Sequence, residues 1–166
     1  MTGTEDFSGF EVIRAAMEVE KNGHRFYSEM AEKAGHPIVR ELFAWLAQDE
    51  VGHLATLQKL VPRYQEGAFW DDEEVFLPYL RRFADRQIFP SAEKLAEALA
   101  TDAPDLAAMD LAIDAEEQFA EYFHQAAKQA RTDEGSEAFS WLAKEEERHA
   151  ALLKERKQTL LAAGGK

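Results

Sequence analysis

Two short motifs in the sequence combine residue types that bind metals in proteins. A glutamate precedes a histidine by three residues at Glu50 and His53, and again at Glu146 and His149. Residues three apart lie on one face of an α-helix, so each pair would direct a carboxylate and an imidazole toward the same point. These ligand types suit iron, manganese or zinc. A lone Glu-x-x-His in an acidic helical chain is usually structural or exposed, so the interpretation depends on its context.

Both motifs belong to an internal repeat in which Glu146 follows Glu50 by 96 residues. At the same offset Phe43-Ala-Trp-Leu-Ala47 returns as Phe139-Ser-Trp-Leu-Ala143, and Ala16-Met-Glu-Val-Glu20 returns as Ala112-Ile-Asp-Ala-Glu116. One offset without gaps serves both halves, which chance explains poorly. The repeat selects Glu146 among three consecutive glutamates, and it adds two further glutamates to the candidate site.

The added residues, Glu20 and Glu116, interrupt the apolar faces of their expected helices, where an unpaired carboxylate is costly to desolvate. In each half this glutamate lies about as far before the turn as the Glu-x-x-His motif lies after it, to within two residues. Antiparallel packing therefore places all three residues at one height, roughly 24 Å from the turn. Packing of the two halves should bring together Glu20, Glu50, His53, Glu116, Glu146 and His149.

Four clustered carboxylates would repel one another in the absence of a cation. Two divalent ions cancel four negative charges, and two trivalent ions with one bridging oxide also leave the cluster neutral. The six residues therefore predict a site for two metal ions. Two iron ions are expected, with manganese or zinc as alternatives.

The elements that must position these residues are four long helices in two hairpins. Apolar residues recur at helical spacing over about residues 9–66 and again over about 105–162. Residues 67–104 hold an acidic run and three prolines, and they predict a partly helical crossover. Two tight hairpins joined by one long connection are typical of an all-α, ferritin-like four-helix bundle. We expect a single domain over 1–166; a four-helix bundle without a site is the plain alternative.

Local signals place the ends of the helices. Ser8-Gly-Phe-Glu11 is typical of a capping box that opens the first helix. Gly35-His36-Pro37 predicts its end, with the glycine in the left-handed conformation and the proline in the next first turn. Short helices are expected at 75–85 and 91–100. The third long helix should span about 105–131, and the fourth should follow the Thr132–Ser136 turn.

Composition excludes several classes of function. The chain has 166 residues, of which 46% are hydrophobic and 31% charged, as in soluble globular proteins. It has no cysteine, which excludes disulfides, thiol catalysis and iron–sulfur clusters. A net charge of −13 argues against nucleic-acid binding. No apolar run approaches the roughly 20 residues of a membrane span, and no secretory signal is evident, so a cytoplasmic protein is expected.

The sequence resembles the rubrerythrin-like branch of the ferritin-like superfamily over about residues 10–66 and 105–160. The most specific segments are Glu-Lys-Asn-Gly-His-Arg-Phe-Tyr27, Asp-Glu-Val-Gly-His53 and Glu-Glu-Arg-His149. The resemblance implies a di-iron carboxylate centre, reactions with peroxide or dioxygen, and often a homodimer. It further implies that Glu20 and Glu116 are terminal ligands and that Glu50 and Glu146 bridge the two ions. His53 and His149 would complete the two metal sites.

Two departures from that family bear on the reaction. Rubrerythrins proper carry a rubredoxin module with four cysteines, so this chain without cysteine would need an external electron donor protein. Their third bundle helix usually carries an extra glutamate one turn after the terminal ligand. Phe119 occupies that position here, so the ligand switching associated with efficient peroxidases is not expected.

Aromatic residues near the motifs allow more than one interpretation. Tyr27 lies two turns beyond Glu20 and could hydrogen-bond a ligand carboxylate or pass an electron. Its repeat partner is Phe123, so a packing role is an equal alternative. Trp45 and Trp141 match each other in the repeat and are expected to anchor the core.

Polar residues around the motifs are weighed in the same way. Asp49 and Glu145 each precede a candidate ligand and could accept the second N–H of a ligand histidine, although exposed surface is the favoured interpretation. The other three histidines lie outside any ligand motif and are expected to be structural or on the surface: His24, His36 and His124.

These observations favour a non-haem di-iron oxidoreductase that reduces peroxide or dioxygen with an external electron donor. Two alternatives remain open. One is an iron-binding or storage protein without useful turnover. The other is a metal-stabilised bundle that acts through protein contacts.

Overall fold

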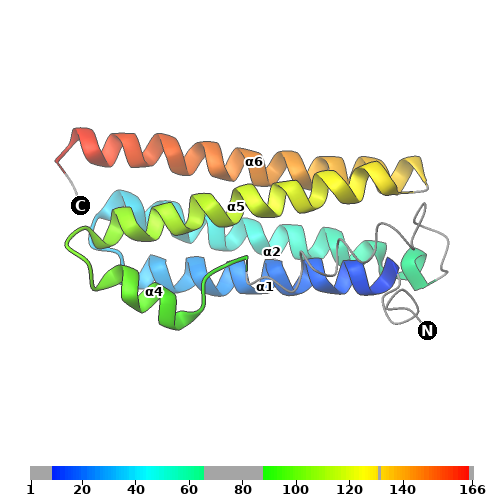
Figure 1. The fold of residues 1–166 in the computed structure, drawn as a ribbon, viewed down its shortest axis with the longest axis horizontal. Coiled ribbons are helices and arrows are strands. Elements are labelled where there is room, and N and C mark those ends of the chain that lie inside the picture. The colour runs from blue at the N-terminus through cyan, green and yellow to red at the C-terminus, as the bar shows by residue number, and fades with distance from the viewer. Residues whose placement is uncertain (1–8, 66–87, 131, 165–166) are drawn as a thin grey trace.

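The computed structural model describes residues 9–65, 88–130 and 132–164. Its helices are α1 (Gly9–Lys33), α2 (Pro37–Gln65), α4 (Ala92–Leu99), α5 (Pro104–Gln129) and α6 (Asp133–Ala162). The pair α1 and α2 and the pair α5 and α6 form two antiparallel hairpins that lie side by side (Figure 1). The predicted all-α bundle of two hairpins with a partly helical connection is thereby confirmed.

The connection contributes α4, which matches the helix predicted at 91–100 and packs against α5. Its N-terminus is capped by Ser91, whose Oγ accepts a hydrogen bond from Lys94 N at 3.2 Å. The helix predicted at 75–85 and the capping box predicted at Ser8 fall outside the described residues. None of the described helices is long and apolar enough to cross a membrane.

The first hairpin turn is held by a residue from the second hairpin. The buried carboxylate of Asp105, at the start of α5, accepts hydrogen bonds from Gly35 N and His36 N, both at 2.9 Å. Arg40 donates to the carbonyl oxygens of Ala34 and Gly35. The helix therefore ends where the sequence predicted, but the left-handed conformation predicted for Gly35 is wrong. Among the described glycines only Gly164 has a positive φ.

The second hairpin turn follows a more familiar pattern. Thr132 caps α6, because its side-chain oxygen accepts a hydrogen bond from Gly135 N at 3.0 Å. Asp133 and Glu134 lie in the first turn of α6, where their charges favour the helix dipole. Both turns are thus fixed by side-chain oxygens, and the height of each helix in the bundle is set.

An aromatic core joins the connection to the bundle. Phe89 is 1% exposed, and its ring centroid lies 6.1 Å from that of Phe26, 5.6 Å from Tyr27 and 6.3 Å from Phe119. A Cβ atom built on Gly23 of α1 would lie 2.9 Å from Phe89 Cε2. Glycine at this mid-helix position therefore leaves room for the aromatic ring that covers α1.

Candidate metal centre

The six residues predicted to converge lie together in the interior of the bundle. Each is at most 1% exposed, and each replaces an apolar residue on the inward face of its helix. Helix α1 contributes Glu20, and α2 contributes Glu50 and His53. Helix α5 contributes Glu116, and α6 contributes Glu146 and His149. The inward position follows from helical periodicity and the common height from the two hairpin turns.

The imidazoles face carboxylates through their Nδ1 atoms. His53 Nδ1 lies 2.6 Å from Glu146 Oε1 and 3.5 Å from Glu20 Oε2. His149 Nδ1 lies 2.7 Å from Glu116 Oε2. The contact of His53 with Glu146 crosses from one hairpin to the other, which ties the two halves of the repeat together at the candidate site.

The two Glu-x-x-His motifs form the centre of the cluster. One potential ligand atom from each of Glu50, His53, Glu146 and His149 lies within 4.8 Å of the others. The rings of His53 and His149 stack with centroids 5.1 Å apart and planes 12° apart. Glu50 Oε1 lies 3.3 Å from His149 Nδ1, a second contact between the hairpins. Helices α2 and α6 thus meet at this quartet.

Seven of the eight carboxylate oxygens in the cluster lack a hydrogen-bond partner, and the exception is Oε2 of Glu116. Both oxygens of Glu20, Glu50 and Glu146 are buried without a hydrogen bond, as is Oε1 of Glu116. Buried unpaired polar atoms cost free energy, and native proteins rarely keep so many in one place. Carboxylate oxygens and imidazole nitrogens are the donor atoms that iron, manganese and zinc accept, so this donor set fits a pair of such ions.

Crowding shifts the pKa values of these acids. Burial, followed by repulsion from Glu50 and Glu146, raises the pKa of Glu20 well above its usual value. Burial and the charge of Glu116 do the same to the pKa of Glu146. Burial and Glu50 also raise the pKa of Glu116. Burial alone would raise the pKa of Glu50, but contacts with Glu20 and His149 lower it. Protons therefore compensate part of the negative charge when no cation does.

A layer of partly exposed acids surrounds the outward faces of the imidazoles. Asp49 is 28% exposed, and its Oδ2 lies 2.6 Å from His149 Nε2 in a hydrogen bond. The favoured prediction of exposed surface for Asp49 is wrong, because this contact fixes the orientation of the His149 ring. Glu145 is 19% exposed, and its Oε1 lies 3.6 Å from His53 Nε2, beyond hydrogen-bond distance.

Two tryptophans flank the cluster, and their predicted role as core anchors is wrong. Trp45 is 43% exposed and Trp141 is 45% exposed. The rings of Trp45 and His149 pack edge to face with their centroids 5.8 Å apart, and those of Trp141 and His53 do the same at 5.6 Å. Each indole therefore covers the solvent side of a candidate ligand. Arg148, which is not among the predicted site residues, lies with its Cζ atom 5.4 Å from the Trp45 ring centroid.

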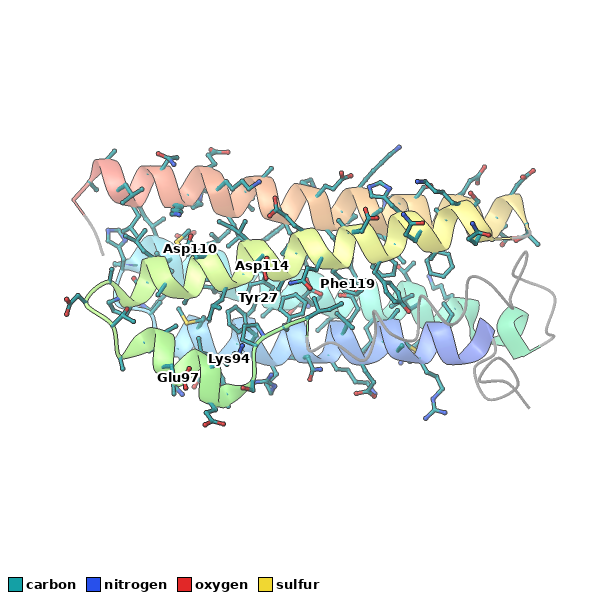
Figure 2. All side chains as sticks on the ribbon, viewed as in Figure 1. Tyr27, Lys94, Glu97, Asp110, Asp114 and Phe119 are labelled. Atoms are coloured by element: carbon teal, nitrogen blue, oxygen red, sulfur yellow. The ribbon has the colours of Figure 1, made fainter. Side chains whose placement is uncertain are left out.

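Tyr27 lies inside the bundle and is fully buried (Figure 2). Its ring stacks on that of Phe43 at 5.5 Å, and its hydroxyl makes no hydrogen bond. Burial and the charge of Glu116 raise the pKa of the phenol well above its usual value, which keeps it protonated. Of the predicted alternatives, packing is observed and a hydrogen bond to a candidate ligand is not.

The remaining histidines make contacts away from the cluster. His24 Nδ1 lies 2.9 Å from Ala47 O, and His36 Nδ1 accepts a hydrogen bond from Ile38 N. His124 Nε2 lies 3.3 Å from Glu147 Oε1. None of the three joins the six candidate ligands, as expected from the repeat.

Comparison with known proteins bears on the fold. No protein-family model matches the chain, and no curated protein matches it in sequence. A solved structure from Thermotoga maritima, provisionally described as a ferritin-like diiron-carboxylate protein, is similar with a TM-score of 0.61 and 21% sequence identity. The alignment covers 91% of this chain and 95% of the other. The chain therefore has a ferritin-like fold, with a buried cluster of glutamates and histidines between its two hairpins.

Proposed function

We propose that the chain is a non-haem di-iron carboxylate protein of the rubrerythrin-like kind, which reduces peroxide or dioxygen with electrons from an external donor. The observation that carries the proposal is the set of buried carboxylate oxygens without hydrogen-bond partners, contributed by all four long helices. Two divalent cations would neutralise the four carboxylates and satisfy these oxygens, which hydrophobic packing alone cannot do. The Thermotoga neighbour is described as a diiron-carboxylate protein, which agrees with a pair of iron ions.

The contacts suggest a role for each residue. Glu50 and Glu146 belong to the central quartet, which supports a bridging role between two ions. Glu20 and Glu116 lie at its edges and contact His53 and His149 respectively, which supports terminal roles. Asp49 would hold the His149 ring so that Nδ1 faces inward, with the proton on Nε2.

A pair of ferrous ions, when bound, would supply two electrons to the oxidant. The chain contributes a fixed geometry and shelter from bulk water, since all six residues are buried. For hydrogen peroxide the balance is two electrons and two protons taken up, the O–O bond broken and two water molecules released. The external donor then restores the two electrons. Without cysteine, the chain has no rubredoxin-type centre of its own to serve as that donor.

Phe119 supports a set of six ligands without an additional glutamate. It is fully buried, and its ring centroid lies 4.4 Å from that of Phe123. An aromatic side chain packed in this way cannot ligate a metal, so we propose that oxidation leaves the protein ligands in place.

Anaerobic iron loading tests the function. The apoprotein would be given two equivalents of Fe(II) and then one equivalent of hydrogen peroxide, with ferric absorbance and residual Fe(II) measured. We expect one peroxide to oxidise two ferrous ions, much faster than it oxidises Fe(II) in buffer. A Glu50→Gln variant should lose this rate, whereas Glu147→Gln should keep it, because Glu147 is exposed and lies outside the cluster. Oxidation no faster than in buffer would eliminate the proposal.

The oligomer is a separate part of the proposal. A homodimer is expected, and sedimentation would measure it. A dimer speaks against mineral storage, which requires a large protein shell.

A further inference from the structure

A second group of potential ligands lies immediately outside His53. His53 Nε2 is 3.6 Å from Asp49 Oδ2 and 3.6 Å from Glu145 Oε1. One ligand atom from each of the three residues lies within 4.8 Å of the others. The two carboxylates are partly exposed, whereas His53 is 1% exposed. This outer cluster of Asp49, Glu145 and His53 therefore connects solvent with the buried centre.

The outer cluster departs from the symmetry of the repeat. His149 Nε2 has a hydrogen bond to Asp49 at 2.6 Å, whereas the equivalent nitrogen of His53 has none. A buried imidazole nitrogen without a partner is uncommon in native proteins. It faces the gap between two carboxylates, at a separation that a direct hydrogen bond does not span but that a shared cation could.

Both carboxylates face donor groups. Asp49 has a hydrogen bond with His149, and Glu145 accepts two hydrogen bonds from Arg148. Arg148 Nη2 lies 2.7 Å from Glu145 Oε1 and 3.6 Å from Asp49 Oδ2. The Arg148 side chain is 51% exposed, so its guanidinium can swing away into solvent. Arg148 thus supplies positive charge where a divalent cation would otherwise bind.

We propose that Asp49, Glu145 and Nε2 of His53 form a loading site, which captures a divalent cation from solvent before it enters the buried centre. This inference rests on the proposed di-metal function. A metal ion binds His53 only after the ring has released its second proton, and the neutral ring then has one nitrogen lone pair. His53 can therefore present it outward through Nε2 or inward through Nδ1, but not both at once. The outer and inner positions are filled in succession, and Arg148 returns to Glu145 once the ion has moved inward.

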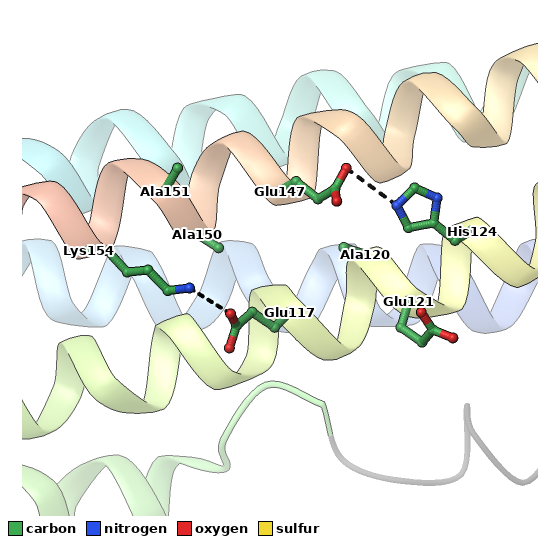
Figure 3. A pocket seen from close by; sticks show the side chains of 8 residues that line it. All are labelled: Glu117, Ala120, Glu121, His124, Glu147, Ala150, Ala151 and Lys154. Atoms are coloured by element: carbon green, nitrogen blue, oxygen red, sulfur yellow. Dashed lines mark hydrogen bonds and ion pairs between the residues drawn. The ribbon is translucent and has the colours of Figure 1, made fainter.

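Stopped-flow loading with Co(II) tests the proposal, because cobalt absorbance reports binding without turnover. Glu145→Gln should slow loading about tenfold while the final capacity stays at two ions. The matched control is Glu147→Gln on the same helix. Glu147 is 56% exposed and pairs with His124 across the groove between α5 and α6, away from the outer cluster (Figure 3). The control should load at the wild-type rate.

A second pair of variants tests the opposite sign. Arg148→Gln should load faster than wild type, because the competing positive charge is gone. Lys154→Gln removes an equally exposed cation that pairs with Glu117 in the groove of Figure 3, and it should leave the rate unchanged. Equal rates for Glu145→Gln and wild type, or equal slowing by Glu145→Gln and Glu147→Gln, would overturn the loading site.

The final ion count separates this proposal from the proposed function. Two ions in wild type with no effect of Glu145→Gln on rate refutes the loading site alone. Failure of wild type to bind two ions refutes the di-metal centre. Loss of an ion from Glu145→Gln at equilibrium would also overturn the loading role, since the residue would then belong to the final site. Anomalous scattering from crystals soaked briefly in Co(II) should show an ion beside Asp49 and Glu145 that Glu145→Gln crystals lack.

Discussion

Without metal, the folded chain should bind more protons than the unfolded chain at the buried cluster. The pKa values of Glu20, Glu116 and Glu146 are raised by burial and by neighbouring acids. Burial alone would lower the pKa of His53 and of His149, but contacts with the carboxylates raise both. A group whose pKa is raised by folding stabilises the native state fully below its unfolded pKa. That stability is lost as the pH rises toward the folded pKa.

The size of this effect follows from the number of protons. Each proton that only the folded chain holds changes the free energy of unfolding by about 1.4 kcal/mol per pH unit. An imidazole that keeps its proton only in the folded chain, as the strongly raised pKa of His149 indicates, predicts a loss of about 1.4 kcal/mol per pH unit above about pH 7, where unfolded histidine is neutral; the raised pKa of His53 acts in the same direction. Asp49, Glu50 and Glu145 have lowered pKa values and act in the opposite direction. Their effect falls near the pKa of unfolded acids, about pH 4, outside this window.

Urea unfolding between about pH 7 and pH 9 measures this dependence on chelator-treated and metal-loaded protein. The apoprotein should lose stability steeply over this range, because it releases protons that the folded chain holds. The loss is a large part of the total, since domains of this kind have a free energy of unfolding of only about 5–15 kcal/mol. Two cations replace the protons, so the loaded protein should change little over the same range. Apoprotein stability that is flat or rises with pH would refute this reasoning.

A matched pair of variants assigns the effect to the cluster. Glu146→Gln mimics the protonated acid, so it should stabilise the apoprotein by about 1–3 kcal/mol at the alkaline end and remove the stabilisation by metal. Glu147→Gln should change the stability by less than about 0.5 kcal/mol and keep the response to metal. A loss of alkaline stability in the Glu146→Gln apoprotein would contradict the raised pKa of Glu146.

Three further substitutions test the structure around the site. Asp105→Ala should destabilise by about 2–4 kcal/mol, because Asp105 accepts two backbone N–H groups while buried. The exposed Asp102→Ala is its control, and equal effects in urea unfolding would discount the turn contacts. Gly23→Ala should cost about 1–3 kcal/mol by urea unfolding, because its Cβ would meet the Phe89 ring; an unchanged midpoint would argue against that contact. Tyr27→Phe should change stability by less than about 1 kcal/mol, because the hydroxyl makes no hydrogen bond, and cobalt capacity should stay at two ions. A large loss in either measurement would place the hydroxyl in the site.

Much of the candidate site could be predicted because helices fix both direction and height. A repeat with one offset gave equivalent positions in two hairpins, and helical periodicity directed those positions inward. Distances from the two turns then set a common level. These rules brought all six residues together in the prediction, and the structure places all six in one buried cluster.

Contacts between distant segments were harder to predict. Tryptophan is large and apolar, so the core was the natural expectation for Trp45. Yet Trp45 stands four residues before Asp49, on the face beside the apolar row rather than on it, and this spacing could have placed it at the edge of the cluster. Similarly, the contact between Gly23 and Phe89 joins α1 to the connection between the hairpins, and helical spacing carries no information about which residue of the connection lies there. Gly35 needed no left-handed conformation, because Asp105 satisfies the backbone beyond the helix end.

Anomalous diffraction from crystals of the Fe(II)-loaded protein, grown and kept anaerobically, tests the metal centre most directly. We predict two iron peaks among the six buried residues, with Glu50 and Glu146 between them and one histidine beside each. Crystals with no iron in the bundle interior, or with iron only at exposed acids on the surface, would contradict the account.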